Sequence, residues 1–235
     1  MIWFEVIDAT WPAASSRMAG GFRVREGLGG GSRVSSASLE LALEQADIDA
    51  AIAAHRALGQ QPKFIIRPGE EALDAALAAR GFERFDPVRI YDAPLDALAS
   101  NVPPVTAFAH WPPLQIAREV WAEGGIGPGR QAVAERAPMP KAAILGRRND
   151  RAAGAAFIGI HAGIAMLHGL FVLPEFRRGG LAAAMMAEAV RWAKDAGASR
   201  LSLVVTEANG AANALYARIG MAPVCHYHYR REAQR

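Results

Sequence analysis

The stretch from residue 170 to residue 182 carries the residue types best suited to holding a phosphorylated ligand. An apolar strand runs into a proline turn, and an arginine- and glycine-bearing loop then leads directly into a helix. At such a junction the loop and the first helical turn present unpaired N–H groups, and the helix dipole adds positive potential. Small residues let the backbone approach a ligand closely. The spacing therefore predicts a pyrophosphate cradle. Its members are Leu170, Phe171, Val172, Arg177, Arg178, Gly179, Gly180, Leu181 and Ala182.

A second segment strengthens this interpretation. It reads Asn209-Gly-Ala-Ala212-Asn-Ala-Leu-Tyr216-Ala-Arg-Ile-Gly220-Met221. Together with Arg177-x-x-Gly180-x-Ala182, it resembles the GNAT superfamily of acetyl-CoA-dependent N-acetyltransferases. That family has a Gln/Arg-x-x-Gly-x-Gly/Ala fingerprint at the same strand–loop–helix junction, followed by an Asn, Ala, Leu-Tyr and Gly-aromatic signature. Met221 replaces the usual Phe, a volume-tolerant change. The resemblance covers residues 104–231.

The resemblance implies a mixed α/β fold and acetyl-CoA as cosubstrate. The cradle would hold the cofactor, with Asn209, Ala212 and Tyr216 as further contacts. By the same resemblance, Tyr216 is the acid for the leaving thiolate, and a backbone N–H near Leu170 donates to the thioester oxygen. Simpler interpretations exist: Asn209 as an N-cap alone, Tyr216 as a core aromatic, and the glycines as an ordinary loop.

The general base is less well defined by the residues. His168 precedes Leu170 by two positions on the same strand and is the main candidate, directly or through water. A structural strand histidine explains it equally well. His161 is a weaker candidate, and Glu175 in the proline turn is expected to be solvated. No histidine or cysteine spacing indicates a metal site.

The loop at residues 123–130 is expected to border the acceptor amine, because the corresponding loop does so in the GNAT superfamily. Its glycines predict an adaptable connector, and Ile126 and Arg130 are its candidate substrate contacts. Arg130 has the geometry to form a bidentate pair with an acceptor carboxylate. An exposed arginine on a flexible connector is the alternative, with similar weight.

Periodicity and turn residues predict the elements of the second half in the order β-α-α-β-β-β-α-β-α-β. This order indicates a mixed sheet with helices on both faces. Strands are expected at 105–109, 141–147, 153–160, 164–172, 201–205 and 223–229. Helices are expected from Pro112-Pro113 to about residue 122, and at 130–135, 181–196 and 211–218.

The first half is interpreted as a degenerate copy of the same fold. Aligning Gly81 with Gly220 brings the preceding strand and helix into register, but nothing there matches Arg177, Gly180, Asn209 or Tyr216. The expected organisation is a non-binding domain at 1–98 that covers the acceptor entrance, a linker at 99–104 and a catalytic domain at 105–235. Its strands are expected at 2–8, 21–26, 33–37, 64–66 and 88–91, and its helices at 46–58 and 70–80.

Composition limits the remaining possibilities. Hydrophobic residues make up 51% and charged residues 21% of 235 residues, enough apolar material to bury a core. No apolar run reaches the ~20 residues of a membrane span, and a single cysteine excludes an internal disulfide. The formal charge of +3 is not concentrated in a basic run, which disfavours nucleic-acid binding. A cytoplasmic location is therefore expected. The resemblance to the GNAT superfamily implies an enzyme that acts on a small-molecule or peptide amine. A homodimer and a non-catalytic CoA-binding or ligand-sensing module remain open.

Overall fold

The computed structural model describes residues 2–233 and resolves them into two compact units. Unit 1 holds residues 2–12, Ile90–Val205 and Asn209–Val224. Unit 2 holds Ala13–Arg89, Thr206–Ala208 and residues 225–233. This division differs from the expected boundary at 99–104, because the first helix and the end of a long strand both belong to unit 1.

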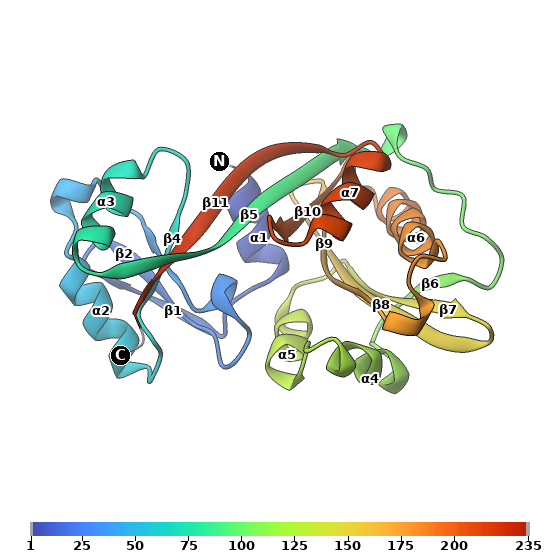
Figure 1. Cartoon of the computed structure of the whole chain (residues 1–235), viewed down its shortest axis with the longest axis horizontal. Coiled ribbons are helices and arrows are strands. Elements are labelled where there is room, and N and C mark those ends of the chain that lie inside the picture. The colour runs from blue at the N-terminus through green and yellow to red at the C-terminus, as the bar shows by residue number, and fades with distance from the viewer. Residues whose placement is uncertain (1, 234–235) are drawn as a thin grey trace. The chain divides into compact units, whose positions relative to one another are not determined.

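Unit 1 contains a mixed sheet with the hydrogen-bonded order β11-β5-β10-β9-β8-β7-β6 (Figure 1). Pairing is antiparallel from β6 to β9, and β9 pairs with β10 in parallel. The strands are β5 (Phe82–Pro94, in unit 1 from Ile90), β6 (Ala107–His110), β7 (Lys141–Arg148), β8 (Arg151–His161), β9 (Ile164–Val172), β10 (Arg200–Thr206) and β11 (Ala222–Glu232, in unit 1 to Val224). All the strands expected in the second half are present; β9 has the expected ends, and the other strands have shifted ends.

Helix α6 (Leu181–Asp195) packs closely on one face of this sheet. The strands beneath it have glycines at the contact. A Cβ at Gly146 or at Gly154 would lie 2.6 Å from Sδ of Met185, whose side chain is fully buried. Core packing of this density tolerates no added methyl group without movement. The helix is therefore held at a short distance from β7 and β8, and its first turn stays beside the end of β9.

The N-terminal segment is a helix, α1 (Ile2–Thr10), and the expected strand at 2–8 is wrong. Its apolar residues suit either structure, but packing selects the helical phase. Val6, Ile7 and Thr10 are buried against β8 and β9, followed by buried Trp11. This spacing is that of one helix face. The strand interpretation failed because a short apolar run does not distinguish helix from strand.

Helices α4 (Gln115–Glu123), α5 (Pro128–Arg136) and α7 (Gly210–Arg218) complete unit 1. The second of these begins at Pro128, earlier than expected, since proline is favoured in a first helical turn. Its C-terminus is held by the ammonium of Lys141, which donates to the carbonyl oxygens of Ala134, Glu135 and Ala137 at 3.2, 2.6 and 2.6 Å. The same ammonium lies 4.2 Å from the ring centroid of Trp111.

Unit 2 has its own core, formed where helices α2 (Ile48–Ala57) and α3 (Glu71–Ala79) pack on a second set of strands. Phe22, Phe64, Leu73, Leu77 and Phe82 are among its most buried side chains. The order there is β1-β2-β3-β4-β11-β5. Its remaining strands are β1 (Ser15–Ala19), β2 (Phe22–Glu26), β3 (Ala37–Leu39) and β4 (Lys63–Ile66).

Three expectations for this unit need correction. Strand β1 was missed because its sequence is polar and exposed, and it forms only by pairing with β2. The strand expected at 33–37 is instead a 3-10 turn at Ser32–Val34 followed by β3. The strand expected at 88–91 is the thirteen-residue β5. The helix expected at 46–58 is confirmed as α2, with Asp47 as its N-cap.

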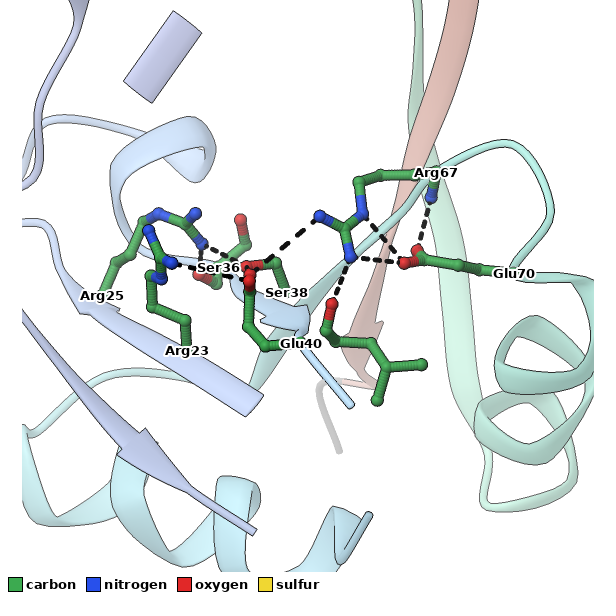
Figure 2. Close-up of polar contacts among 8 residues, drawn as sticks. Arg23, Arg25, Ser36, Ser38, Glu40, Arg67 and Glu70 are labelled. Atoms are coloured by element: carbon green, nitrogen blue, oxygen red, sulfur yellow. Dashed lines mark hydrogen bonds and ion pairs between the residues drawn. The ribbon is translucent and has the colours of Figure 1, made fainter. Parts of the chain in front are cut away.

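A polar network covers the ends of β2, β3 and β4 in unit 2 (Figure 2). Buried Arg25 donates to Oγ of Ser38 at 3.0 Å, and that hydroxyl donates to Glu40 at 2.7 Å. Glu40 also pairs with Arg23 at 3.5 Å, and Arg67 binds Glu70 at 2.7 Å. Each of these carboxylates therefore has cationic partners, so the network satisfies its own charges. The expectation that this half derives from a second copy stays a hypothesis.

Candidate functional site

Strand β9 is distorted where the sequence predicted a thioester-binding backbone. Ala155 pairs with Phe171 and Phe157 pairs with His168, so Gly169 and Leu170 together lie opposite a single residue of β8. This is a β-bulge, and Gly169 takes the positive φ of 57° that such a bulge favours. Because the bulge redirects the backbone, the N–H and C=O groups of Leu170 do not follow the regular hydrogen-bond ladder with β8.

The bulge coincides with a change in strand pairing. On one side β9 pairs with β8 as far as Val172, whereas on the other it pairs with β10 only as far as Leu167. Gly169, Leu170 and Phe171 are correspondingly half-buried. Within residues 2–233, the N–H and C=O groups at this edge thus have no adjoining β10 ladder. A ligand with amide groups can pair there as an added strand does.

The loop after β9 ends at a helix N-terminus, as predicted. Gly180 is the N-cap of α6 and adopts a left-handed conformation with φ of 83°. A Cβ at this position would meet no atom within 4 Å, so it would project into open space. Arg178 also has a positive φ, 63°, which bends the loop around the helix start. This geometry leaves the first-turn N–H groups of α6 accessible to an anion.

A cleft of about 460 Å³ lies between the end of β9, the start of α6 and helix α7. Its size is in the range of small-molecule sites. Segments far apart in the sequence meet there, and most of the predicted cofactor contacts line it: Leu170, Phe171, Val172, Arg177, Arg178, Gly180, Leu181, Ala182, Asn209, Ala212 and Tyr216. Gly179 lies on the other side of the loop, where the guanidinium of Arg148 donates to its carbonyl oxygen.

The two loop arginines differ in their surroundings. Nε of Arg177 donates to the carbonyl oxygen of Val172 at 2.9 Å, and its guanidinium lies 5.5 Å from the ring centroid of Phe171. These contacts tie the loop to the end of β9. Arg178 is exposed at the cleft. Arg177 therefore shapes the loop, whereas Arg178 is placed to meet a ligand's negative charge.

Helix α7 begins with a side-chain cap. Oδ1 of Asn209 accepts from the N–H of Ala212 at 3.1 Å, which satisfies one of the unpaired donors of the first turn. Asn209 also lines the cleft, so capping and ligand contact are compatible. Tyr216 lies two turns along the same helix, with its ring 5.7 Å from that of Tyr91 on β5.

Burial controls the acidity of Tyr216. Its side chain is 6% exposed, and desolvation raises its pKa from 10.0 to about 12. The phenol therefore keeps its proton over the whole physiological range. It is available as a hydrogen-bond donor at the cleft and is a weak acid there.

His168 lies in a closed aromatic setting and does not line the cleft. It is 2% exposed and stacks on Trp11 at 4.9 Å and on Phe157 at 6.0 Å. Its Nε2 is 2.9 Å from Oγ1 of Thr10, whose own proton goes to the carbonyl oxygen of Val6 at 2.7 Å. Thr10 must then accept from Nε2–H. This placement favours a structural histidine over a general base.

The other two candidates for proton transfer are at the surface. His161 pairs with Glu5 at 3.0 Å, and Glu175 is exposed in the turn after β9. Neither lines the cleft. No group of three or more metal-ligating side chains occurs in residues 2–233.

Side-chain hydrogen bonds hold the end of the predicted acceptor loop. The side-chain amide of Gln131 donates to the carbonyl oxygens of Ile126 and Arg118 at 2.8 and 3.0 Å. Ile126 approaches the bulge, because a Cβ on Gly169 would lie 3.3 Å from its Cδ1. Arg130 is exposed on α5. The roles of Ile126 and Arg130 stay predictions.

Two residues that support the cleft were not singled out in the sequence. Trp121 on α4 donates from Nε1 to the carbonyl oxygen of Gly169 at 3.0 Å and so braces the bulge. Tyr91 donates to Oδ1 of Asn213 at 3.1 Å and packs on Tyr216. Periodicity indicates that both residues are buried. Their partners are remote in the sequence, so no local signal identifies them as part of the site.

The described part of the chain contains no helix of the length and apolar character that crossing a membrane requires. Comparisons with known proteins give consistent results for the fold. The acetyltransferase (GNAT) family model matches residues 113–221. An uncharacterized N-acetyltransferase, YobR of Bacillus subtilis, is 26% identical over 234 residues, which span 94% of each chain.

Solved structures agree over the whole length. A GCN5-related N-acetyltransferase from Kribbella flavida superimposes with a TM-score of 0.74 at 16% identity, covering 100% of this chain and 95% of that one. A functionally unknown conserved protein from Staphylococcus epidermidis gives 0.68 at 12% identity, covering 97% of both chains. The chain thus has the mixed α/β fold of these structures, and its residues 113–221 are similar to the acetyltransferase (GNAT) family model.

Proposed function

We propose that this protein is an acetyl-CoA-dependent N-acetyltransferase that acts on a primary amine of a small molecule or peptide. The observation that carries the proposal is the cleft at the end of β9. There the open helix N-terminus, the edge of β9 beyond its ladder with β10 and the Tyr216 phenol line one cavity of about 460 Å³. These are the groups needed to hold a pyrophosphate, a pantetheine amide chain and a leaving thiolate.

The residues at the cleft fit such a cosubstrate. Open space at Gly180 and small side chains at Ala182 and Ala183 leave room for phosphates at the start of α6. Bound acetyl-CoA supplies the thioester. The backbone N–H at Leu170 is the proposed donor to its carbonyl oxygen, where negative charge develops as the amine attacks.

In this mechanism Tyr216 donates a hydrogen bond to the leaving sulfur but does not transfer its proton. A phenol with a pKa of about 12 holds its proton against a thiolate whose conjugate acid has a pKa of ~8.5. Tyr216 therefore stabilises the leaving sulfur mainly by hydrogen bonding. The proton that ends on the thiol is the one the attacking amine releases, so the overall transfer balances without a further acid.

Binding and turnover test the proposal separately. CoA at 100 times its Kd should stabilise the protein by about 2.7 kcal/mol, seen as a rise in Tm. Gly180→Glu should abolish the shift, because it places a carboxylate where phosphates would bind. Gly180→Ala is the matched control, because it places a side chain at the same left-handed backbone position without adding a charge. Thiol release from acetyl-CoA with a panel of amines then tests catalysis.

The outcomes separate the alternatives. A CoA-dependent Tm shift without thiol release for any amine would favour a non-catalytic CoA-binding module. If the wild-type protein shows no shift with CoA or acetyl-CoA, the cleft does not bind this cosubstrate and the proposal is wrong.

A further inference from the structure

Three hollows surround the first turn of α6 in unit 1, and Gly180 lines all of them. The first is the cleft described above, on the side of β9 and α7. The second, of about 500 Å³, lies toward the β7–β8 hairpin and residues 103–106. The third, of about 290 Å³, lies along α6 beneath residues 98–103. Figure 1 shows this segment of the chain passing α6 before it enters β6.

The two additional hollows differ in chemistry. The one along α6 is apolar, with Leu98, Pro103, Ala187 and Ile219 among its lining residues. A planar heteroaromatic base can bury its faces on such a surface. The hollow at the hairpin is instead polar, with Arg147, Arg148 and Asp150 among its lining residues. Arginine is the side chain best suited to hold a phosphate monoester through paired hydrogen bonds.

Arg148 is the better placed of the two arginines. Nη1 of Arg148 donates to the carbonyl oxygen of Gly179, which fixes the guanidinium against the loop that forms the cradle. No carboxylate among residues 2–233 pairs with it, and a guanidinium has five N–H donors. Arg147 is engaged differently, in an ion pair with Asp150 at 3.4 Å.

We propose that Arg148 binds the 3′-phosphate of CoA, and that this contact makes the protein select CoA over 3′-dephospho-CoA. The inference rests on the proposed function, since it assumes that the pyrophosphate lies at the start of α6. With the pantetheine in the cleft, the nucleotide end of the molecule extends from Gly180 toward the other two hollows. The apolar hollow then receives the adenine, and the cationic hollow receives the phosphate monoester.

The experiment compares the Kd values of CoA and 3′-dephospho-CoA by isothermal titration calorimetry. The proteins are the wild type, Arg148→Ala and Arg151→Ala. Arg151 lies opposite Arg148 in the register of the β7–β8 hairpin, but it does not line the hollow. Replacing it changes the net charge by the same amount as Arg148→Ala, so it is the matched control. Arg148→Ala should weaken CoA binding by about tenfold to a hundredfold, the usual effect of losing a hydrogen bond to a charged group. It should leave 3′-dephospho-CoA unaffected, and Arg151→Ala should keep the wild-type preference.

The possible results are distinct. Equal weakening of both ligands by Arg148→Ala would mean that the arginine acts only by positioning the Gly179 loop, and the inference would be wrong. Equal affinity of the wild type for both ligands would also overturn it, while leaving the proposed function intact. Failure of the wild type to bind either ligand would remove the proposed function and this inference together.

Discussion

The chemistry of the cleft depends on how burial changes the acidity of one side chain, Tyr216. Desolvation raises the pKa of this phenol to about 12, which keeps it neutral and hydrogen-bonding. Its ring also packs on Tyr91, so part of its surroundings is structural. Removing only the hydroxyl oxygen separates these contributions.

Tyr216→Phe should lower kcat by about tenfold to a hundredfold, because it deletes one hydrogen bond to a developing charge. The Kd for CoA should stay unchanged, since little packing is lost. Because the raised pKa keeps Tyr216 protonated, the kcat of the wild type should show no loss attributable to this group between pH 7 and about pH 10. Unchanged turnover in the variant would assign Tyr216 to packing alone.

His168 presents the opposite case, a candidate catalytic residue whose contacts are structural. His168→Gln keeps an N–H donor for Thr10 but has no group that accepts a catalytic proton at neutral pH. We expect this variant to retain most of its kcat. Any fall in kcat at low pH that the wild type shows should also be present in the variant. His168→Ala should lower the free energy of unfolding by roughly 2–4 kcal/mol through lost packing and an unsatisfied Thr10. If the fall in kcat at low pH disappears in His168→Gln, His168 is instead the general base.

At the scale of elements, ion pairs in unit 2 join α3 to β11. Asp74 accepts from Nε of Arg230 and lies within hydrogen-bond distance of Nε2 of His228, each at 2.7 Å. Hydrogen bonding by Arg230 and, to a lesser extent, by His228 outweighs the effect of burial and lowers the pKa of Asp74 from 3.8 to about 2. A carboxyl group whose pKa is lower in the folded state stabilises the fold only while it is ionised.

Asp74→Asn should therefore lower the urea midpoint at pH 7, where the wild-type carboxylate is ionised. The sign follows from the lowered pKa: the contribution is complete above about pH 4 and is lost as the pH falls through about 2. The difference in urea midpoint between the wild type and Asp74→Asn should therefore shrink as the pH falls from about 4 to about 2. Asp49→Asn removes an exposed ion pair with Arg80 and should change stability by at most about 1 kcal/mol. A difference for Asp74→Asn that does not change with pH would contradict this assignment.

At the scale of the whole molecule, the N-terminal residues are part of unit 1. Val6, Ile7 and Trp11 are buried, with 0%, 5% and 6% of their surface exposed. Burial of each contributes about 1.5–3 kcal/mol, and their sum approaches the ~5–15 kcal/mol that stabilises a typical protein. A chain that begins near residue 102 would lack α1 and β5, so it does not isolate a catalytic domain.

We therefore expect a protein that starts at Val102 to lose cooperative thermal unfolding. A milder variant tests the same contact in the full chain: Val6→Ala should lower the free energy of unfolding by roughly 1–3 kcal/mol. The exposed residue Ile2 on the same helix is the control, and Ile2→Ala should have little effect. A cooperative, acetyl-CoA-binding fragment from residue 102 would show that α1 is dispensable.

Local sequence patterns were enough to predict the elements that carry the cleft and the residue types that line it. Arg177-x-x-Gly180-x-Ala182 predicted a strand–loop–helix junction, and Asn209 predicted a helix cap, because glycine conformation, capping and apolar periodicity are local properties. The ends of β9 were also predicted correctly, since a strand buried on both faces has a continuous apolar run.

Four features became evident only in the folded chain: the helical state of residues 2–10, the bulge at Gly169, the burial of His168 and the position of Tyr91 beside Tyr216. Each of these depends on partners far away in the sequence. Thr10 contacts His168, Trp121 contacts Gly169, and Tyr91 contacts Tyr216. Propensity and spacing describe a residue's neighbours along the chain, whereas proton affinity and strand pairing follow from burial and hydrogen bonds that form only when distant segments pack together.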